Sequence, residues 1–191
     1  THLSALLTEL PRPMVTLASE RMAGRDHARL RGDTMLAMHI AMALGTSAAA
    51  GVALYAAPVL RLLLARGDWT AAEFDAAANA LTLMAAGLAI GLPQLVSRAV
   101  LQGTGRHWAV SRRFFLATSL ALTLGIAGMR LGAGVAAAAA SWALVWVLQG
   151  TVLYPPLLCR ALGVTPGTML REAYLPGAAV GLAVLVTAWG A

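Results

Sequence analysis

Lysine is absent from this chain of 191 residues, and charged residues make up only 12% of it. The single cysteine, Cys159, excludes an internal disulfide. Without lysine, no nucleotide-binding P-loop can be completed. The four histidines form no HExxH pair and have no acidic partner at metal-site spacing. We therefore predict no catalytic residue, no metal site and no cofactor, and the sequence does not support an ATPase, a hydrolase or another enzyme.

Apolar residues dominate instead. They make up 59% of the chain, and the mean hydropathy of +0.74 lies outside the usual range of soluble proteins. Most of the long apolar stretches can cross the hydrocarbon core of a bilayer, which is about 30 Å thick. The sequence thus predicts an all-α fold, a polytopic transmembrane helical bundle. The predicted spans are residues 3–22 (the end of a helix), 34–57, 76–101, 112–129, 135–158 and 173–191.

Local signals predict where these helices begin, bend and end. Pro58 should end the second span, whereas Pro93 should kink the third and turn Gln94 toward the bundle interior. Thr70-Ala71-Ala72-Glu73 fits a capping box at a helix start. Arg130–Gly134 predicts a tight hairpin. Thr165-Pro166 predicts the start of a short helix before the last span.

Two pairs of glycines have the small-xxx-small spacing that lets helices approach closely. They are Gly87 with Gly91 and Gly177 with Gly181. Packing within the chain is the default interpretation of such pairs, and dimerisation is the alternative.

Arginines are distributed unevenly between alternate loops. Segments 21–33, 98–113 and 159–172 hold ten of the fourteen, whereas the opposite loops hold only Arg61, Arg66 and Arg130. Because cytoplasmic loops are enriched in positive residues, the first three segments are predicted to be cytoplasmic. This membrane topology also accounts for the net charge of +6, so nucleic acid is not an expected partner.

Polar side chains within apolar stretches are the best candidates for function, because each is costly in lipid and must face protein or water. Glu9 and Arg12 lie three residues apart near prolines, where carbonyl groups lose their helical partners. Gln94, Arg98 and Gln102 share one helical face. The alternative is that the two arginines only mark where helices leave the membrane.

The layout resembles a known superfamily. A charged segment at 20–33 precedes a long span, and Gly91-Leu92-Pro93 leads to Arg98-Ala99-Val100-Leu101-Gln102-Gly103-Thr104-Gly105-Arg106. A later ending reads Leu157-Leu158-Cys159-Arg160-Ala161-Leu162-Gly163. The pattern resembles the C-terminal half of the multidrug/oligosaccharidyl-lipid/polysaccharide exporter superfamily, most closely its polysaccharide (O-antigen-type) flippase branch.

The resemblance implies that residues 1–191 are a partial C-terminal bundle of a two-bundle, V-shaped transporter in the bacterial cytoplasmic (inner) membrane. Such proteins alternate access to a central cavity and translocate undecaprenyl-diphosphate-linked glycans. Arg12, Gln94, Arg98 and Gln102 are then candidate substrate-binding residues. The implied partners are the glycan lipid, the bilayer and an N-terminal bundle of the same chain.

Three alternatives remain open. A cation-coupled multidrug exporter of the same superfamily would need buried acidic residues, and only Glu9 is a candidate ion-coupling residue. A membrane-embedded glycosyl- or acyltransferase should carry a His/Asp or paired-acid motif at a span end, and none is present. A structural membrane subunit is the third alternative, against which the proline-broken spans argue.

The arginine distribution gives a testable topology. In a Cys159→Ser background, a cysteine at position 27 should react with a membrane-impermeant maleimide in inside-out vesicles, and a cysteine at position 70 should not. The reason is the ten-to-three arginine bias. Right-side-out vesicles, in which the pattern should reverse, are the control. Labelling of both positions from the same side would contradict the topology.

Overall fold

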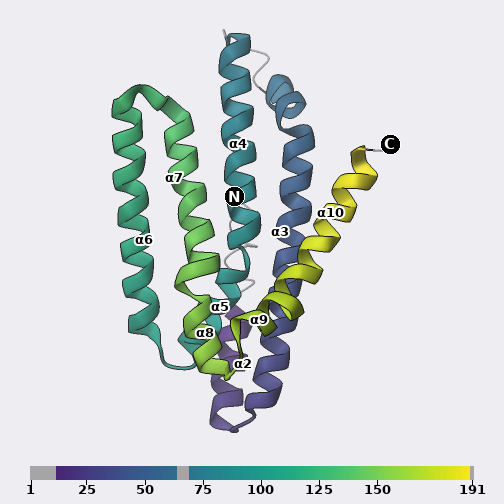
Figure 1. Ribbon diagram of the computed structural model, residues 1–191, viewed down its shortest axis with the longest axis vertical. Helices are drawn as coiled ribbons and strands as arrows, with labels where there is room; N and C mark the ends of the chain where they lie inside the picture. Colours follow the sequence, from purple (N-terminus) through teal and green to yellow (C-terminus); the bar gives the residue numbers. More distant parts are fainter. Residues whose placement is uncertain (1–11, 64–68, 190–191) are drawn as a thin grey trace.

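The computed structural model describes residues 12–63 and 69–189, and within these ranges the protein consists of helices and contains no strand. Long helices run roughly alongside one another in the longest direction of the molecule, and shorter helices gather at one end, which we call the lower end after its place in Figure 1. The expected all-α fold class is therefore confirmed. Residues 3–11 of the predicted span 3–22 lie outside the described residues, and the rest of that span is helical, in α2 (Arg12–Ala23).

Three helical stretches of the described residues are long and apolar enough to cross a membrane: His27–Leu63, Ala71–Gly91 and His107–Leu162. The last of these folds back on itself. Its first arm is α6 (His107–Gly128), and its second arm begins with α7 (Gly134–Leu148). The two run antiparallel in Figure 1.

The turn between α6 and α7 depends on glycine. Gly132 has a φ of 87° and Gly134 a φ of 52°, both in the left-handed region that favours a residue without a Cβ. The chain can therefore reverse within Met129–Ala133. This confirms the hairpin predicted at Arg130–Gly134.

Helix α3 (His27–Leu63) is longer than the predicted span 34–57. It begins earlier because the Asp26 carboxylate accepts a hydrogen bond from the Arg29 amide at 3.1 Å and so caps the helix start. Its 37 residues correspond to roughly 55 Å, well beyond the hydrocarbon thickness of a bilayer. The basic segment 21–33 is thus mostly helical, with a turn at residues 24–26 between α2 and α3.

The prediction that Pro58 ends this helix was wrong. A proline removes one hydrogen bond and disturbs the preceding turn, but the chain can resume helical geometry after it. Helix α3 continues through Pro58 to Leu63, and its last turns bend away from the main axis in Figure 1. Leu62 and Leu63 in these turns are exposed.

The next helix, α4 (Ala71–Gly91), starts at the predicted capping box. The Thr70 hydroxyl accepts a hydrogen bond from the Glu73 amide at 3.3 Å, and the Glu73 carboxylate accepts one from the Thr70 amide at 2.8 Å. These two bonds satisfy donors that a helix start otherwise leaves unpaired. Helix α4 therefore begins at a defined residue.

The predicted span 76–101 is divided at Pro93. Leu92 keeps helical backbone angles and its amide donates to the Leu88 carbonyl at 2.7 Å, but Pro93 has no amide hydrogen to continue the ladder. The chain resumes as α5 (Pro93–Gly103), which leaves the axis of α4 in Figure 1. The predicted kink is confirmed, although it separates two helices.

The predicted span 135–158 is also divided. A π-helical turn, Gln149–Leu153, follows α7, and Tyr154 precedes α8 (Pro155–Leu162). The break has the same cause as the one at Pro93, since consecutive prolines follow Tyr154 and cannot donate to the preceding turn. The predicted span 135–158 is therefore helical over most of its length but interrupted near its end.

The short helix predicted at Thr165-Pro166 is present as α9 (Pro166–Met169). The Thr165 hydroxyl accepts a hydrogen bond from the Thr168 amide at 3.1 Å and caps it. A second π-helical turn, Leu170–Tyr174, then leads into α10 (Leu175–Trp189). Helix α10 diverges from α3 toward the end of the chain in Figure 1.

Both glycine pairs make close contacts within the chain. A Cβ on Gly87 would lie 2.5 Å from the Ala143 Cα, and one on Gly91 would lie 2.6 Å from the Trp146 carbonyl oxygen, so α4 and α7 pack backbone against backbone. Gly177 packs in the same way against α3, where a Cβ would lie 2.7 Å from the His39 carbonyl oxygen. The default interpretation, packing within the chain, is confirmed for both pairs.

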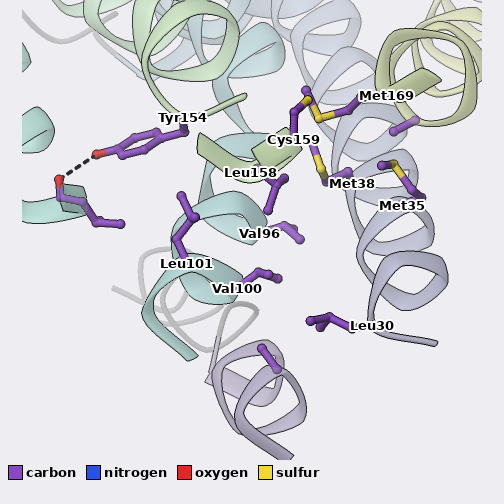
Figure 2. Packing of buried hydrophobic residues seen from close by; sticks show 13 residues of the cluster. Leu30, Met35, Met38, Val96, Val100, Leu101, Tyr154, Leu158, Cys159 and Met169 are labelled. Carbon is purple, nitrogen blue, oxygen red and sulfur yellow. Dashed lines mark hydrogen bonds between the residues drawn. The ribbon is translucent and has the colours of Figure 1, made fainter. Parts of the chain in front are cut away.

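The lower end holds the main hydrophobic core. Figure 2 shows Leu30 of α3, Leu101 of α5 and Leu158 of α8 among its members, all completely buried. Helix α2 packs closely against Gly103 at the end of α5. A Cβ on this glycine would lie only 2.5 Å from the Val15 carbonyl oxygen of α2. The short helices thus form one packed block below the long ones.

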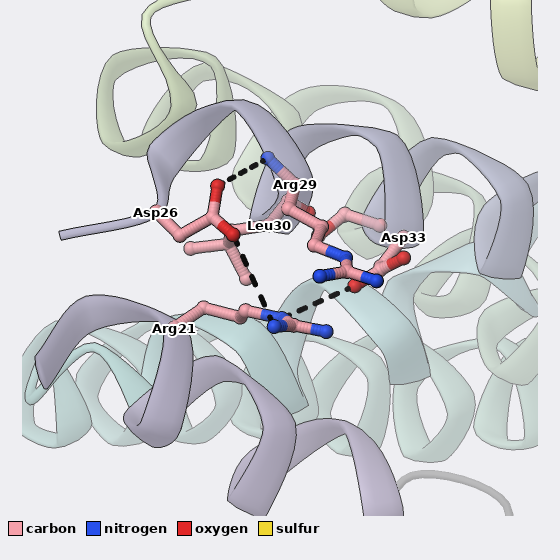
Figure 3. Close-up of polar contacts among 6 residues, drawn as sticks. Arg21, Asp26, Arg29, Leu30 and Asp33 are labelled. Carbon is pink, nitrogen blue, oxygen red and sulfur yellow. Dashed lines mark hydrogen bonds and ion pairs between the residues drawn. The ribbon is translucent and has the colours of Figure 1, made fainter. Parts of the chain in front are cut away.

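Ion pairs reinforce this block. Arg21 of α2 lies 3.9 Å from a carboxylate oxygen of Asp26 and 3.6 Å from one of Asp33, as Figure 3 shows, and Arg31 lies 3.5 Å from one of Glu172. The arginine-rich segments 21–33, 98–113 and 159–172 gather in the lower part of the molecule, opposite the start of α4 and the α6–α7 hairpin (Figure 1). This is the grouping that the arginine distribution predicts.

The close contact of α4 and α7 should be sensitive to one methyl group. We expect Gly87→Ala to lower the free energy of unfolding by about 1–3 kcal/mol, because the added Cβ meets the backbone of Ala143. Gly51→Ala in α3 is the matched control, since a Cβ there meets nothing within 4 Å, and it should stabilise by about 1 kcal/mol or less. Unfolding in detergent measures both, and equal effects would contradict the packing.

Candidate functional site

Three helix interruptions meet around Gly150. A Cβ on Gly150 would lie 2.8 Å from the Gly91 Cα, so the π-helical turn after α7 touches the end of α4 just before the Pro93 break. The Tyr174 hydroxyl donates a hydrogen bond of 2.7 Å to the Gly150 carbonyl. The π-helical turn before α10 therefore reaches the same place.

Interrupted helices in a membrane protein need special surroundings. At Pro93 the regular helical ladder loses one bond, and in the turn 149–153 the wider π-helical pattern replaces it, as the Tyr154 amide donates to the Gln149 carbonyl at 3.2 Å. Irregular backbone is tolerated at membrane depth only where protein covers it or where it lines a water-filled cavity. The convergence of these breaks is therefore a candidate binding centre.

Two buried amide side chains lie on these interrupted segments. Gln94, the second residue of α5, is 1% exposed, and Gln149, the first residue of the π-helical turn, is 2% exposed. Gln94 Oε1 and Gln149 Nε2 have no hydrogen-bond partner among the described residues. An unpaired buried polar group costs about 1–3 kcal/mol, so a hydrogen-bond partner that reached these atoms would stabilise them.

The prediction that Gln94 faces the bundle interior is confirmed by its burial. Its neighbour Ser97 is completely buried as well, and the Ser97 hydroxyl donates to the Pro93 carbonyl at 3.2 Å. This bond satisfies a backbone group within the first turn of α5. The two buried polar side chains of α5 therefore differ. The Ser97 hydroxyl has a hydrogen-bond partner, whereas Gln94 Oε1 has none among the described residues.

Arg98 lies one turn after Gln94 on α5 and is partly buried. Its guanidinium carbon is 4.6 Å from the centroid of the Phe114 ring, a cation–π contact that directs the side chain toward α6. Gln102, one turn further, is also partly buried. The structure thus places three of the predicted substrate residues along α5.

The side chains of the other two predicted residues lie outside the described part of the structure. Arg12 is the first residue of α2, and only its helical backbone is described. Glu9, the candidate ion-coupling residue, lies outside the described residues. Their roles remain predictions from the sequence.

Neither Gln149 nor Tyr174 is among the candidate site residues that the sequence predicts. A signal was present, because Gln149-Gly150-Thr151 interrupts an apolar span shortly before Pro155-Pro156. What the sequence does not contain is the proximity of Gly150 to Gly91, which arises only when α4 and α7 pack together.

Two apolar grooves lie elsewhere on the described part of the molecule. One of about 380 Å³ lies between α3, α4 and α10, and one of about 210 Å³ lies between α6 and α7. Alanine, leucine and threonine side chains line most of the first, which suits acyl chains better than a polar substrate. No group of three or more metal-ligating side chains occurs within the described ranges.

Comparisons with protein-family models, with curated proteins and with solved structures find no match for this chain. Function is therefore inferred from its own residues and their arrangement.

The unpaired amide of Gln94 has a measurable consequence for stability. We expect Gln94→Leu to leave the free energy of unfolding unchanged or to raise it by about 1–2 kcal/mol, because it removes a buried group without a partner. Ser97→Ala is the control, and it should lower stability by about 1 kcal/mol, since the Ser97 hydroxyl is hydrogen-bonded. Denaturation in detergent tests the pair. A clear loss of stability for Gln94→Leu would indicate that its amide is fully paired.

Proposed function

We propose that this chain is part of a membrane transporter that moves lipid-linked oligosaccharide or polysaccharide precursors across the bacterial cytoplasmic membrane by alternating access. The observation that carries the proposal is the meeting of three helix interruptions around Gly150, together with the unpaired amides of Gln94 and Gln149. Transporters commonly build substrate sites from discontinuous helices, whose freed backbone groups and polar side chains contact the cargo.

The arrangement of the helices supports movement. The breaks at Pro93 and Tyr154 separate the long helices α4 and α7 from α5 and α8 of the lower block. The block is itself held together by its core and by the ion pairs of Arg21 and Arg31. At these two breaks a few element-terminal residues can absorb a change of angle, which is the usual form of a hinge. Helix α3 runs unbroken from the block, so access to the centre would change as α4 and α7 tilt at their breaks.

The chemistry of α5 supports a glycan substrate with a phosphate group. Amide side chains such as Gln94 and Gln102 can donate to and accept from sugar hydroxyl groups. The guanidinium of Arg98 suits the oxygens of a diphosphate. We propose that these residues contact substrate, that Arg12 contributes as well, and that an N-terminal bundle of the same protein completes the cavity. No catalytic step is part of this function.

The distribution of carboxylates argues against the cation-coupled exporter. Ion coupling needs a carboxylate within the membrane, and each acidic side chain of the described residues lies in α2, near the start of α3 or α4, or in the π-helical turn before α10. These residues are Glu20, Asp26, Asp33, Glu73, Asp75 and Glu172. The exporter alternative therefore depends on Glu9.

Transport by the full-length protein tests the proposal. In proteoliposomes that contain a fluorescent lipid-linked oligosaccharide, we expect Gln94→Leu and Gln149→Leu to slow translocation at least tenfold. The loss of a substrate hydrogen bond worth about 1.5 kcal/mol corresponds to roughly that factor.

Thr123→Val is the matched control for this assay. It also replaces a polar side chain by an apolar one within a predicted span, but Thr123 is exposed on α6, away from the interrupted helices, and its hydroxyl bonds only to the Ser119 carbonyl. Its rate should stay near that of the wild type. Normal transport by both glutamine variants would refute a role for the centre.

A further inference from the structure

Side chains from three helical elements gather around the hydroxyl of Tyr154. The Tyr154 ring is completely buried, and its hydroxyl donates to the Val110 carbonyl of α6 at 3.5 Å (Figure 2). Phe114 lies one turn further along α6 and carries the guanidinium of Arg98 over its ring. Arg98 and Arg113 both lie close enough to act electrostatically on the Tyr154 hydroxyl. A corner between α5, α6 and the start of α8 therefore holds two guanidinium groups.

A third guanidinium adds to this charge. Arg160 of α8 acts on Arg113 with like charge, and Arg112 does so from the adjacent position on α6. Nη1 of Arg113 is buried and has no hydrogen-bond partner among the described residues. Gathering like charges at a partly desolvated position is unfavourable unless an opposite charge compensates them.

The described part of the chain supplies no such compensation. Its ion pairs involve Arg21, Arg31 and Arg61, and none joins Arg98, Arg113 or Arg160 to a carboxylate. A donor group without a protein acceptor and a local excess of positive charge both indicate a bound anion.

The position of the corner identifies the kind of anion. Arg113 precedes Gly128, at the hairpin end of α6, by fifteen residues, which is roughly 22 Å at about 1.5 Å per residue. Across a hydrocarbon core of about 30 Å, an arginine side chain at this depth reaches the headgroups of the lower leaflet. Trp108, 78% exposed, lies further toward that surface, as expected of an interfacial aromatic residue.

The outer surface of α6 beside the corner is apolar. Phe115 is 70% exposed and Leu116 is 58% exposed, so acyl chains can lie against the helix directly above the arginines. A free phosphate ion would use only the guanidinium groups, whereas a phospholipid would use both surfaces. Basic pockets between membrane helices on the cytoplasmic side are typical sites for anionic headgroups.

We propose that Arg113 and Arg160, which lie beside Arg98, bind the phosphate group of an anionic bilayer phospholipid in the lower leaflet. Guanidinium groups donate paired hydrogen bonds to phosphate oxygens, and the headgroup neutralises the repulsion between the arginines. Tyr154 forms the buried wall behind them. The site would be occupied whether or not the chain transports a glycan, so it does not depend on the proposed function.

The test compares lipids and variants with the purified full-length protein in neutral detergent. Phosphatidylglycerol should raise the melting temperature of the wild type more than phosphatidylcholine does, and native mass spectrometry should detect its retention. Arg113→Gln combined with Arg160→Gln should weaken phosphatidylglycerol binding at least tenfold. Arg130→Gln at the opposite end of the molecule is the matched control and should leave binding unchanged.

Two results would overturn the proposal. One is equal phosphatidylglycerol binding by the double variant and by Arg130→Gln. The other is equal stabilisation by inorganic phosphate alone, which would assign the corner to a soluble anion. If the double glutamine variant does not fold, the corresponding lysine variants replace it. The lysine variants keep the positive charge but lose the paired hydrogen bonds of a guanidinium. Their affinity for phosphatidylglycerol should therefore be lower than that of the wild type. An affinity equal to that of the wild type would count against the site.

Discussion

Backbone hydrogen bonding in a medium without water is the constraint on which the rest of this structure depends. Long uninterrupted helices satisfy it along most of α3, α4 and α6. Where the helical hydrogen-bond ladder is broken, neighbouring segments cover the break. Gly150 lies against Gly91, and the Tyr174 hydroxyl donates a hydrogen bond to the Gly150 carbonyl. The interruptions are therefore tolerated because they meet. The unpaired amides of Gln94 and Gln149 lie on these same interrupted segments, which links the stability of the fold to its proposed function.

The lower end of the molecule and the opposite end are built from different structural elements. The lower end combines short helices, a hydrophobic core and ion pairs that join α2 to α3 and α3 to the segment before α10. The opposite end includes a glycine-dependent hairpin and a capped helix start. Arginines of the segments predicted to be cytoplasmic also supply the lower block with its ion pairs, except at the corner around Tyr154. There the same residue type lacks a carboxylate, and a lipid phosphate takes that place in our proposal.

Features with a local cause could be predicted from the sequence. The caps at Thr70 and Thr165, the hairpin near Gly132 and the break at Pro93 each follow from a few adjacent residues. Pro58 was misjudged because a proline shows that one bond is lost and does not show whether the helix resumes. At the candidate site, Gln94 could be predicted from the kink beside it. The proximity of Gly150 to Gly91, and of Arg113 to Arg160, depends on how distant helices pack, which periodicity does not encode.

The contact between Gly91 and Gly150 has an evolutionary consequence. In most packed pairs, a larger residue on one side can be accommodated when its partner becomes smaller, so the two positions drift together. Here a Cβ on Gly150 would lie 2.8 Å from backbone atoms of Gly91 and Ile90, and glycine at 91 is already the smallest residue. No second substitution can restore the space. Descendants of this sequence should therefore keep glycine at position 150 for as long as the two broken helices remain in contact, and replacement there would mark a lineage in which the crossing itself has been rebuilt.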